Sequence, residues 1–78
     1  MAREYPHDIE AERSLLGSML ISSDACQSIL SLATKEDFYL DSHRLLFEAM
    51  QSIDSQNNPV DVTTLTSYLI DKKLLEKI

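Results

Sequence analysis

Four side chains near the N-terminus have the chemistry of a possible metal site. His7, Asp8, Glu10 and Glu12 fall within six residues, and imidazole and carboxylate groups are common ligands of divalent metals. The sequence contains neither of the strong zinc signatures, H-E-x-x-H and C-x-x-C. Asp8 is also a favoured helix N-cap, and Glu10 and Glu12 would lie at the positive end of the helix that follows. We therefore interpret the cluster as the start of a helix.

The other reactive side chains do not form a catalytic set. His43 lies beside the apolar face of an expected helix, with no acid at a helical spacing that would orient it as a general base. Cys26 has no nearby histidine and lies among apolar residues, which favours a core position. Glu36 and Asp37 are adjacent and point in different directions, and a single glycine cannot form a phosphate-binding loop. The sequence predicts no catalytic, cofactor or metal site, which argues against a small hydrolase.

Three aromatic residues, Tyr5, Phe47 and Tyr68, are candidate anchors for a protein partner. Tyrosine is enriched at the energetic hot spots of interfaces, but aromatic residues are also ordinary core residues. We assign Phe47 mainly to the core. For Tyr5 and Tyr68 both positions remain open, so no partner-binding residue is assigned.

Size and charge limit the function further. The 78 residues allow one domain, residues 1–78, with no room for a nucleotide-binding α/β domain beside the core. Seven basic and thirteen acidic residues give a net charge of −6, so we expect no direct nucleic-acid binding by this chain. An acidic surface suits a basic protein partner, and it also suits solubility.

Cysteine content and hydropathy indicate a compartment. Cys26 is the only cysteine, so no intramolecular disulfide can form, as expected in a reducing cytoplasm. No apolar run approaches the roughly 20 residues that span a bilayer. Residues 1–12 are acidic where a signal peptide would be basic and then apolar. We predict a cytoplasmic protein that does not enter the membrane.

Helical spacing of apolar residues predicts a first helix after Asp8 and a second, shorter helix. The polar residues 22–24 should end the first helix and cap the second. Gly17 lies beside the first apolar stripe, where we expect another helix to pack closely. The first stripe consists of Ile9, Leu15, Leu16, Met19 and Leu20, and the second of Cys26, Ile29, Leu30 and Ala33.

The middle of the chain contains the expected central helix. A capping box that begins at Thr34, with an acid three residues later, should carry Phe38 and Tyr39 into the core. A helix over residues 42–55, capped by Asp41, should be buried on several sides, because its apolar residues cover more than half of its circumference. Those apolar residues are Leu45, Leu46, Phe47, Ala49, Met50 and Ile53.

A polar turn over residues 55–59 should separate the central helix from a fourth helix capped by Asp61. The fourth stripe consists of Val62, Leu65 and Leu69, flanked by Tyr68. Residues 72–78 resemble another helix just beginning, so we expect a longer parent protein. The whole pattern predicts an all-α fold, a compact bundle of four to five short helices around a central third helix.

Four segments of the sequence occur in a characteristic order. They are PHDIEAE with LLGSML at residues 6–12 and 15–20, DFY with SHRLLFEAM at residues 37–39 and 42–50, PVDVTTL at residues 59–65, and LLE at residues 74–76. Together they cover nearly the whole chain, and the second is the most specific. The chain resembles the start of the bacterial replicative DNA helicases of the DnaB family.

This resemblance implies a function that the residues alone do not. Family members have an all-helical N-terminal domain, a linker, and a RecA-like motor that hydrolyses ATP and encircles DNA. The match stops before the helical hairpin that completes the N-terminal domain and before the motor, so ATP and Mg would be cofactors of the parent alone. The resemblance implies a non-catalytic collar part that contributes to hexamer assembly with other helicase subunits. It also implies contacts with primase and the helicase loader.

A second function class fits the same composition. A stand-alone small acidic helical adaptor or regulatory protein would have the same helix pattern. The DNA after the codon of Ile78 distinguishes the two, because continuation into a Walker A motif supports the helicase and a stop codon supports the adaptor. An ATPase assay on this chain should show no turnover under either interpretation.

Overall fold

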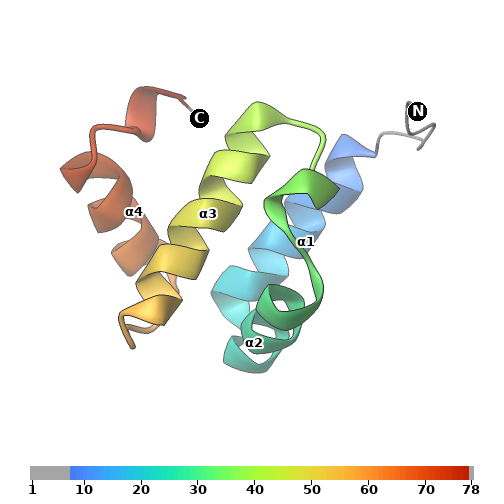
Figure 1. Ribbon diagram of the computed structural model, residues 1–78, viewed down its shortest axis with the longest axis horizontal. Helices are drawn as coiled ribbons and strands as arrows, with labels where there is room; N and C mark the ends of the chain where they lie inside the picture. Colours follow the sequence, from blue (N-terminus) through green and yellow to red (C-terminus); the bar gives the residue numbers. More distant parts are fainter. Residues whose placement is uncertain (1–7, 78) are drawn as a thin grey trace.

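The computed structural model describes residues 8–77, and helix α3 lies at its centre (Figure 1). Its elements in chain order are α1 (Ile9–Ile21), α2 (Ser23–Leu32), η1 (Lys35–Asp37), α3 (Asp41–Ser55), α4 (Val62–Asp71) and η2 (Leu75–Lys77), where η denotes a single 3₁₀ turn. α1 and α2 lie on one side of α3, and α4 lies on the other. No strand occurs within residues 8–77. The predicted all-α bundle around the third helix is confirmed.

Side-chain caps fix the ends of the first two helices. The Asp8 carboxylate accepts a hydrogen bond from the backbone N–H of Ala11 at 3.0 Å. The Ser22 hydroxyl accepts from the N–H of Ala25 at 3.2 Å, while the Ser22 N–H donates to the carbonyl of Ser18 at 2.9 Å. One residue therefore ends α1 and begins α2, as the sequence predicted.

A reciprocal capping box begins α4. The Asp61 carboxylate accepts from the backbone N–H of Thr64 at 2.8 Å, and the Thr64 hydroxyl accepts from the N–H of Asp61 at 3.0 Å. At η1 the Asp37 carboxylate accepts from the N–H of Thr34 at 2.8 Å. The predicted caps at Asp61 and at Thr34 are confirmed, because each places an acceptor or donor where the helix ladder leaves a backbone group unpaired.

The core is built around α3. The rings of Phe38 and Phe47 lie 5.1 Å apart between centroids, and Phe47 is fully buried, which confirms its assignment to the core. Burial of the Cys26 thiol, and to a lesser degree the nearby Asp54 carboxylate, raises its pKa, so Cys26 is a core thiol as predicted. The buried apolar residues are Leu16, Met19, Cys26, Phe38, Phe47, Ala49, Met50, Ile53, Leu65 and Leu69.

Two expectations at the start of α3 are wrong. Tyr39 is 51% exposed, whereas Phe38 is buried. The chain is extended at Phe38, so neighbouring side chains point to opposite sides, and only one of the two can enter the core. α3 begins at Asp41 itself, with Leu40 at the N-cap, so Asp41 does not cap the helix. Its carboxylate lies 3.7 Å from the Arg44 guanidinium instead.

Three expectations about helix faces are also wrong. Leu15 and Val62 are exposed, because α1 presents only part of its stripe to the bundle and α4 packs mainly on α3. A Cβ atom built on Gly17 would meet no heavy atom within 4 Å, so no helix of residues 8–77 packs closely there. Helical spacing predicts the direction in which a side chain points, but it does not predict whether another element covers that side chain.

The ends of α3 and α4 use the left-handed backbone conformation. Asn57 and Lys73 have φ values of 63° and 59°, just after α3 and α4. The predicted polar turn after Ser55 is confirmed, and the expected start of a last helix is the single turn η2. Tyr5, His7 and Ile78 lie outside the described residues. None of the helices within residues 8–77 has the length and apolar character needed to cross a membrane.

Candidate functional site

The polar residues of the bundle gather in two regions on opposite sides of α3. The first, the α1–α3 junction, consists of Glu12, Phe38, Tyr39, His43 and Arg44. His43 Nδ1 lies 2.8 Å from Glu12 Oε1, and both side chains are largely buried. The other Glu12 oxygen accepts from the backbone N–H of Tyr39 at 2.6 Å. The Glu12 carboxylate therefore joins α1 to both the extended segment and α3.

Charge and hydrogen bonding keep Glu12 ionised. Burial is the largest single influence and raises the pKa of this carboxyl group. Hydrogen bonds from the Tyr39 N–H, the His43 ring and the Leu40 N–H, together with the charge of His43, outweigh burial and lower the pKa below its ordinary value. An ionised carboxylate only accepts hydrogen bonds, so His43 donates from Nδ1.

Arg44 completes the junction. Its Nε donates to the carbonyl oxygen of Phe38 at 2.7 Å, which ties the first turn of α3 back to the preceding extended segment. Glu12, Phe38, His43 and Arg44 all belong to the motifs that carry the family resemblance. Their side chains are bonded to one another or packed in the core. The junction therefore holds the fold together and offers no free reactive group.

The described acids of the N-terminal cluster make separate contacts. Within residues 8–77 no group of three or more His, Cys, Asp or Glu could hold a metal ion. Asp8 caps α1, Glu10 pairs with Arg13 at 3.3 Å on the surface, and Glu12 faces His43. The sequence shows no partner acid for His43 at a helical spacing, and Glu12 was missed because the two residues lie 31 positions apart.

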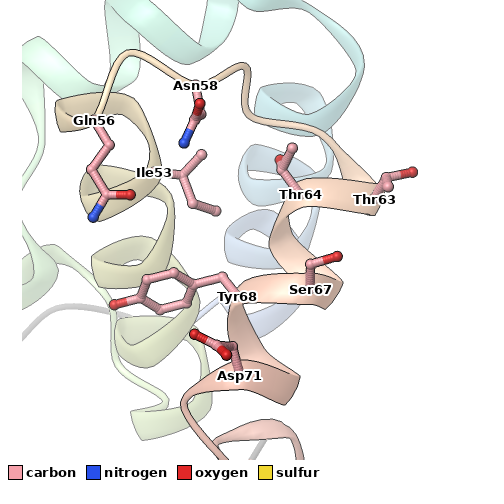
Figure 2. Close-up of a pocket in the computed structure, with 8 residues that line it drawn as sticks. All are labelled: Ile53, Gln56, Asn58, Thr63, Thr64, Ser67, Tyr68 and Asp71. Carbon is pink, nitrogen blue, oxygen red and sulfur yellow. The ribbon is translucent and has the colours of Figure 1, made fainter.

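The second region is a groove of about 400 Å³ between α3 and α4, which we call the α3–α4 groove (Figure 2). Its lining residues come from the end of α3, the loop after it, and one face of α4. They are Ile53, Gln56, Asn58, Thr63, Thr64, Ser67, Tyr68 and Asp71. Of the two candidate aromatic anchors within residues 8–77, Phe47 lies in the core, whereas Tyr68 lines the groove, half-buried, with its ring directed toward α3 (Figure 2).

Seven of the eight residues that line this groove carry a side chain that can form hydrogen bonds. Thr64 is used by the α4 capping box. Within residues 8–77, the side chains of Gln56, Asn58, Thr63 and Ser67 make no intramolecular hydrogen bond, and Asp71 makes no ion pair. Sequence reasoning missed this region, because its residues come from two helices and the loop between them, and only Thr63 and Thr64 belong to a motif segment.

The fold defines the class first. Within residues 8–77 the chain is a small all-α bundle in which α1, α2 and α4 lie around a central α3 (Figure 1), and the charged residues of the junction are internally bonded. A family model described as "DnaB-like helicase N terminal domain" matches residues 4–78. The chain therefore belongs to the family of DnaB-like helicase N-terminal domains.

Curated relatives carry the name of the enzyme. The chain is 38% identical over 73 residues to "Replicative DNA helicase DnaB" of Pasteurella multocida, covering 94% of this chain and 16% of that protein. It is 40% identical over 67 residues to the protein of the same name from Leifsonia xyli, covering 86% of this chain and 15% of that protein. The chain spans about a sixth of the length of these relatives.

A solved structure has the same fold. The N-terminal domain of DnaB helicase from Mycobacterium tuberculosis superposes with a TM-score of 0.86 and 33% identity. The match covers 92% of this chain and 51% of that domain. The described bundle corresponds to about half of the related domain.

Proposed function

We propose that this chain is the non-catalytic N-terminal collar part of a cytoplasmic replicative DNA helicase, and that it contributes to hexamer assembly and to contacts with primase and the helicase loader. The structural match to a DnaB N-terminal domain is the observation that carries the proposal. The relatives' name and the family model support it. ATP and Mg would act in a motor domain of the parent, and this chain contributes no residue to that chemistry.

A binding experiment tests the proposal. The full-length protein and its N-terminal region, both containing residues 1–78, are mixed with the purified C-terminal domain of primase and recovered by pull-down. We expect both to retain the primase domain. Retention by the full-length protein alone would assign the primase contact to other segments, and the collar role proposed here would then lack a partner function.

A further inference from the structure

The α3–α4 groove contains one carboxylate, Asp71, that is available for pairing with a cation. Asp71 is the one charged residue among those that line it, and no lysine or arginine lines it. The nearest cation is Lys72, whose ammonium group lies 5.8 Å from the centroid of the Tyr68 ring rather than on the Asp71 carboxylate. Among residues 8–77 the Asp71 carboxylate therefore has no ion-pair partner.

The position of Asp71 is unfavourable for its own helix. Asp71 is the last residue of α4, and a carboxylate at the negative end of a helix dipole is repelled by it. Lys72 at the C-cap and Lys73 after it follow α4 directly, but within residues 8–77 neither forms an ion pair with the Asp71 carboxylate. The Asp71 carboxylate and the partial negative charge of the helix C-terminus lie close together. A cation from a partner would stabilise both.

The dimensions of the groove fit a peptide. Its lining residues on α4 run from Thr63 to Asp71, which is about 12 Å along the helix axis. About four residues of extended chain cover that length. The unpaired side chains of Gln56 and Asn58 near one end, and of Thr63 and Ser67 along it, can exchange hydrogen bonds with peptide groups.

We infer that the α3–α4 groove binds a peptide segment of a partner protein, and that an arginine or lysine of this segment pairs with Asp71. The inference rests on the proposed role of the chain in protein contacts and names the part of the surface that makes one. The acidic net charge of −6 favours the approach of such a basic segment.

Peptide titration tests the inference. The ¹⁵N-labelled chain is titrated at low ionic strength with the acetylated, amidated heptapeptide Ser-Leu-Ala-Arg-Ala-Leu-Ser. A matched peptide has citrulline, which is neutral and nearly isosteric, in place of arginine. We expect saturable amide shifts confined to residues 53–58 and 63–72, with a Kd on the order of 1 mM. The citrulline peptide should bind about two- to fivefold more weakly, as for loss of one exposed ion pair.

Two variants of the chain sharpen the result. Asp71→Asn should weaken binding of the arginine peptide by about two- to fivefold. The variant should then bind the arginine and citrulline peptides equally. Asp24→Asn, an exposed acid on α2, should leave both affinities unchanged. Equal binding of the two peptides, shifts that map outside the groove, or no shifts at 10 mM peptide would each overturn the inference.

The titration does not use primase, so the two proposals fail separately. If peptide binding in the groove depends on Asp71 but the primase domain is not retained, the groove inference is supported and the proposed primase contact is contradicted. Retention of the primase domain that Asp71→Lys leaves unchanged, together with a silent titration, would keep the collar role and overturn the groove.

Discussion

The α1–α3 junction and the α3–α4 groove use polar side chains in opposite ways. At the junction, Glu12 and His43 are buried and bonded to each other, and the Arg44 guanidinium is bonded to a backbone carbonyl. In the groove, Ser67 and Asp71 are exposed and have no partner within residues 8–77. A buried polar group must be paired to be tolerated, whereas an unpaired polar group in a groove is free to bind a partner.

The two regions also differ in how many residues of the family motifs they contain. The junction residues Glu12, Phe38, His43 and Arg44 all belong to segments that carry the family resemblance, and their contacts join α1, the extended segment and α3. Of the residues that line the groove, only Thr63 and Thr64 belong to such a segment, and Thr64 is used by the α4 capping box. The bonded polar residues of the junction and the unpaired polar residues of the groove therefore lie on different sides of α3 (Figure 1), and each set can be perturbed without the other.

Removing an aromatic ring at the junction side of α3 should have the largest effect. Phe47→Ala removes a fully buried ring and should lower the free energy of unfolding by about 3–5 kcal/mol. A domain has roughly 5–15 kcal/mol in total, so much of the fold would be lost. Urea denaturation followed by circular dichroism measures the change. Phe47→Leu gives a smaller, measurable loss, and the exposed Ile70→Ala is the control.

Removing the junction carboxylate should have the next largest effect. Glu12→Ala leaves the His43 ring and the Tyr39 N–H without their acceptor, which should cost about 1–3 kcal/mol. Glu10→Ala, three-quarters exposed on the same helix, should change stability by less than about 0.5 kcal/mol. Equal losses in the two variants would show that the junction is not a distinct stabilising unit.

The same carboxylate should make stability depend on pH. The pKa of Glu12 is lowered in the folded chain, so its contribution is complete above the unfolded value of about 4.3 and is lost as pH falls through the lower folded value. The free energy of unfolding of the wild type should therefore fall more steeply below pH 4.3 than that of Glu12→Gln. Parallel pH profiles of the two proteins would contradict the assigned hydrogen bonds.

Gly17 offers a stabilising change on the outer side of α1. Alanine should raise the free energy of unfolding by about 0.5–1 kcal/mol, because glycine is a poor helix former and the added Cβ meets open space. Thermal denaturation of the 78-residue chain checks the sign. A lower melting temperature would mean that the Gly17 face is packed more tightly than the described residues show.

A groove substitution should have the smallest effect on stability. Ser67→Ala removes a hydroxyl that makes no hydrogen bond within residues 8–77, so the free energy of unfolding should change by less than about 0.5 kcal/mol. The same variant should bind the arginine heptapeptide more weakly. A loss of stability comparable to that of Glu12→Ala would remove the distinction between the two regions.

Most helix boundaries follow from local sequence, because caps act within a few residues. Asp8, Ser22 and Asp61 determine helix starts by hydrogen bonds to nearby backbone groups, and the sequence predicted all three. The Glu12–His43 pair was not predicted, because no local pattern reports a contact between residues 31 positions apart. The groove was not predicted for the same reason.

The wrong predictions about which side chains are buried have a different cause. Val62 has the right spacing to face the core, but it is 63% exposed because no further helix covers that side of α4 within residues 8–77. Gly17 shows the converse, since its small size suggested a close neighbour and the structure has none. Spacing along one helix does not reveal how many neighbours surround it.

Cys26 can serve as a probe of local opening of the bundle. It is the only cysteine in the sequence, and its side chain is buried. Burial raises the pKa of the thiol, which disfavours the reactive thiolate form. A thiol reagent can therefore modify it only when α2 separates from the bundle. The rate of modification in native buffer measures how often that separation occurs, and its dependence on urea distinguishes the detachment of one helix from the opening of the whole bundle.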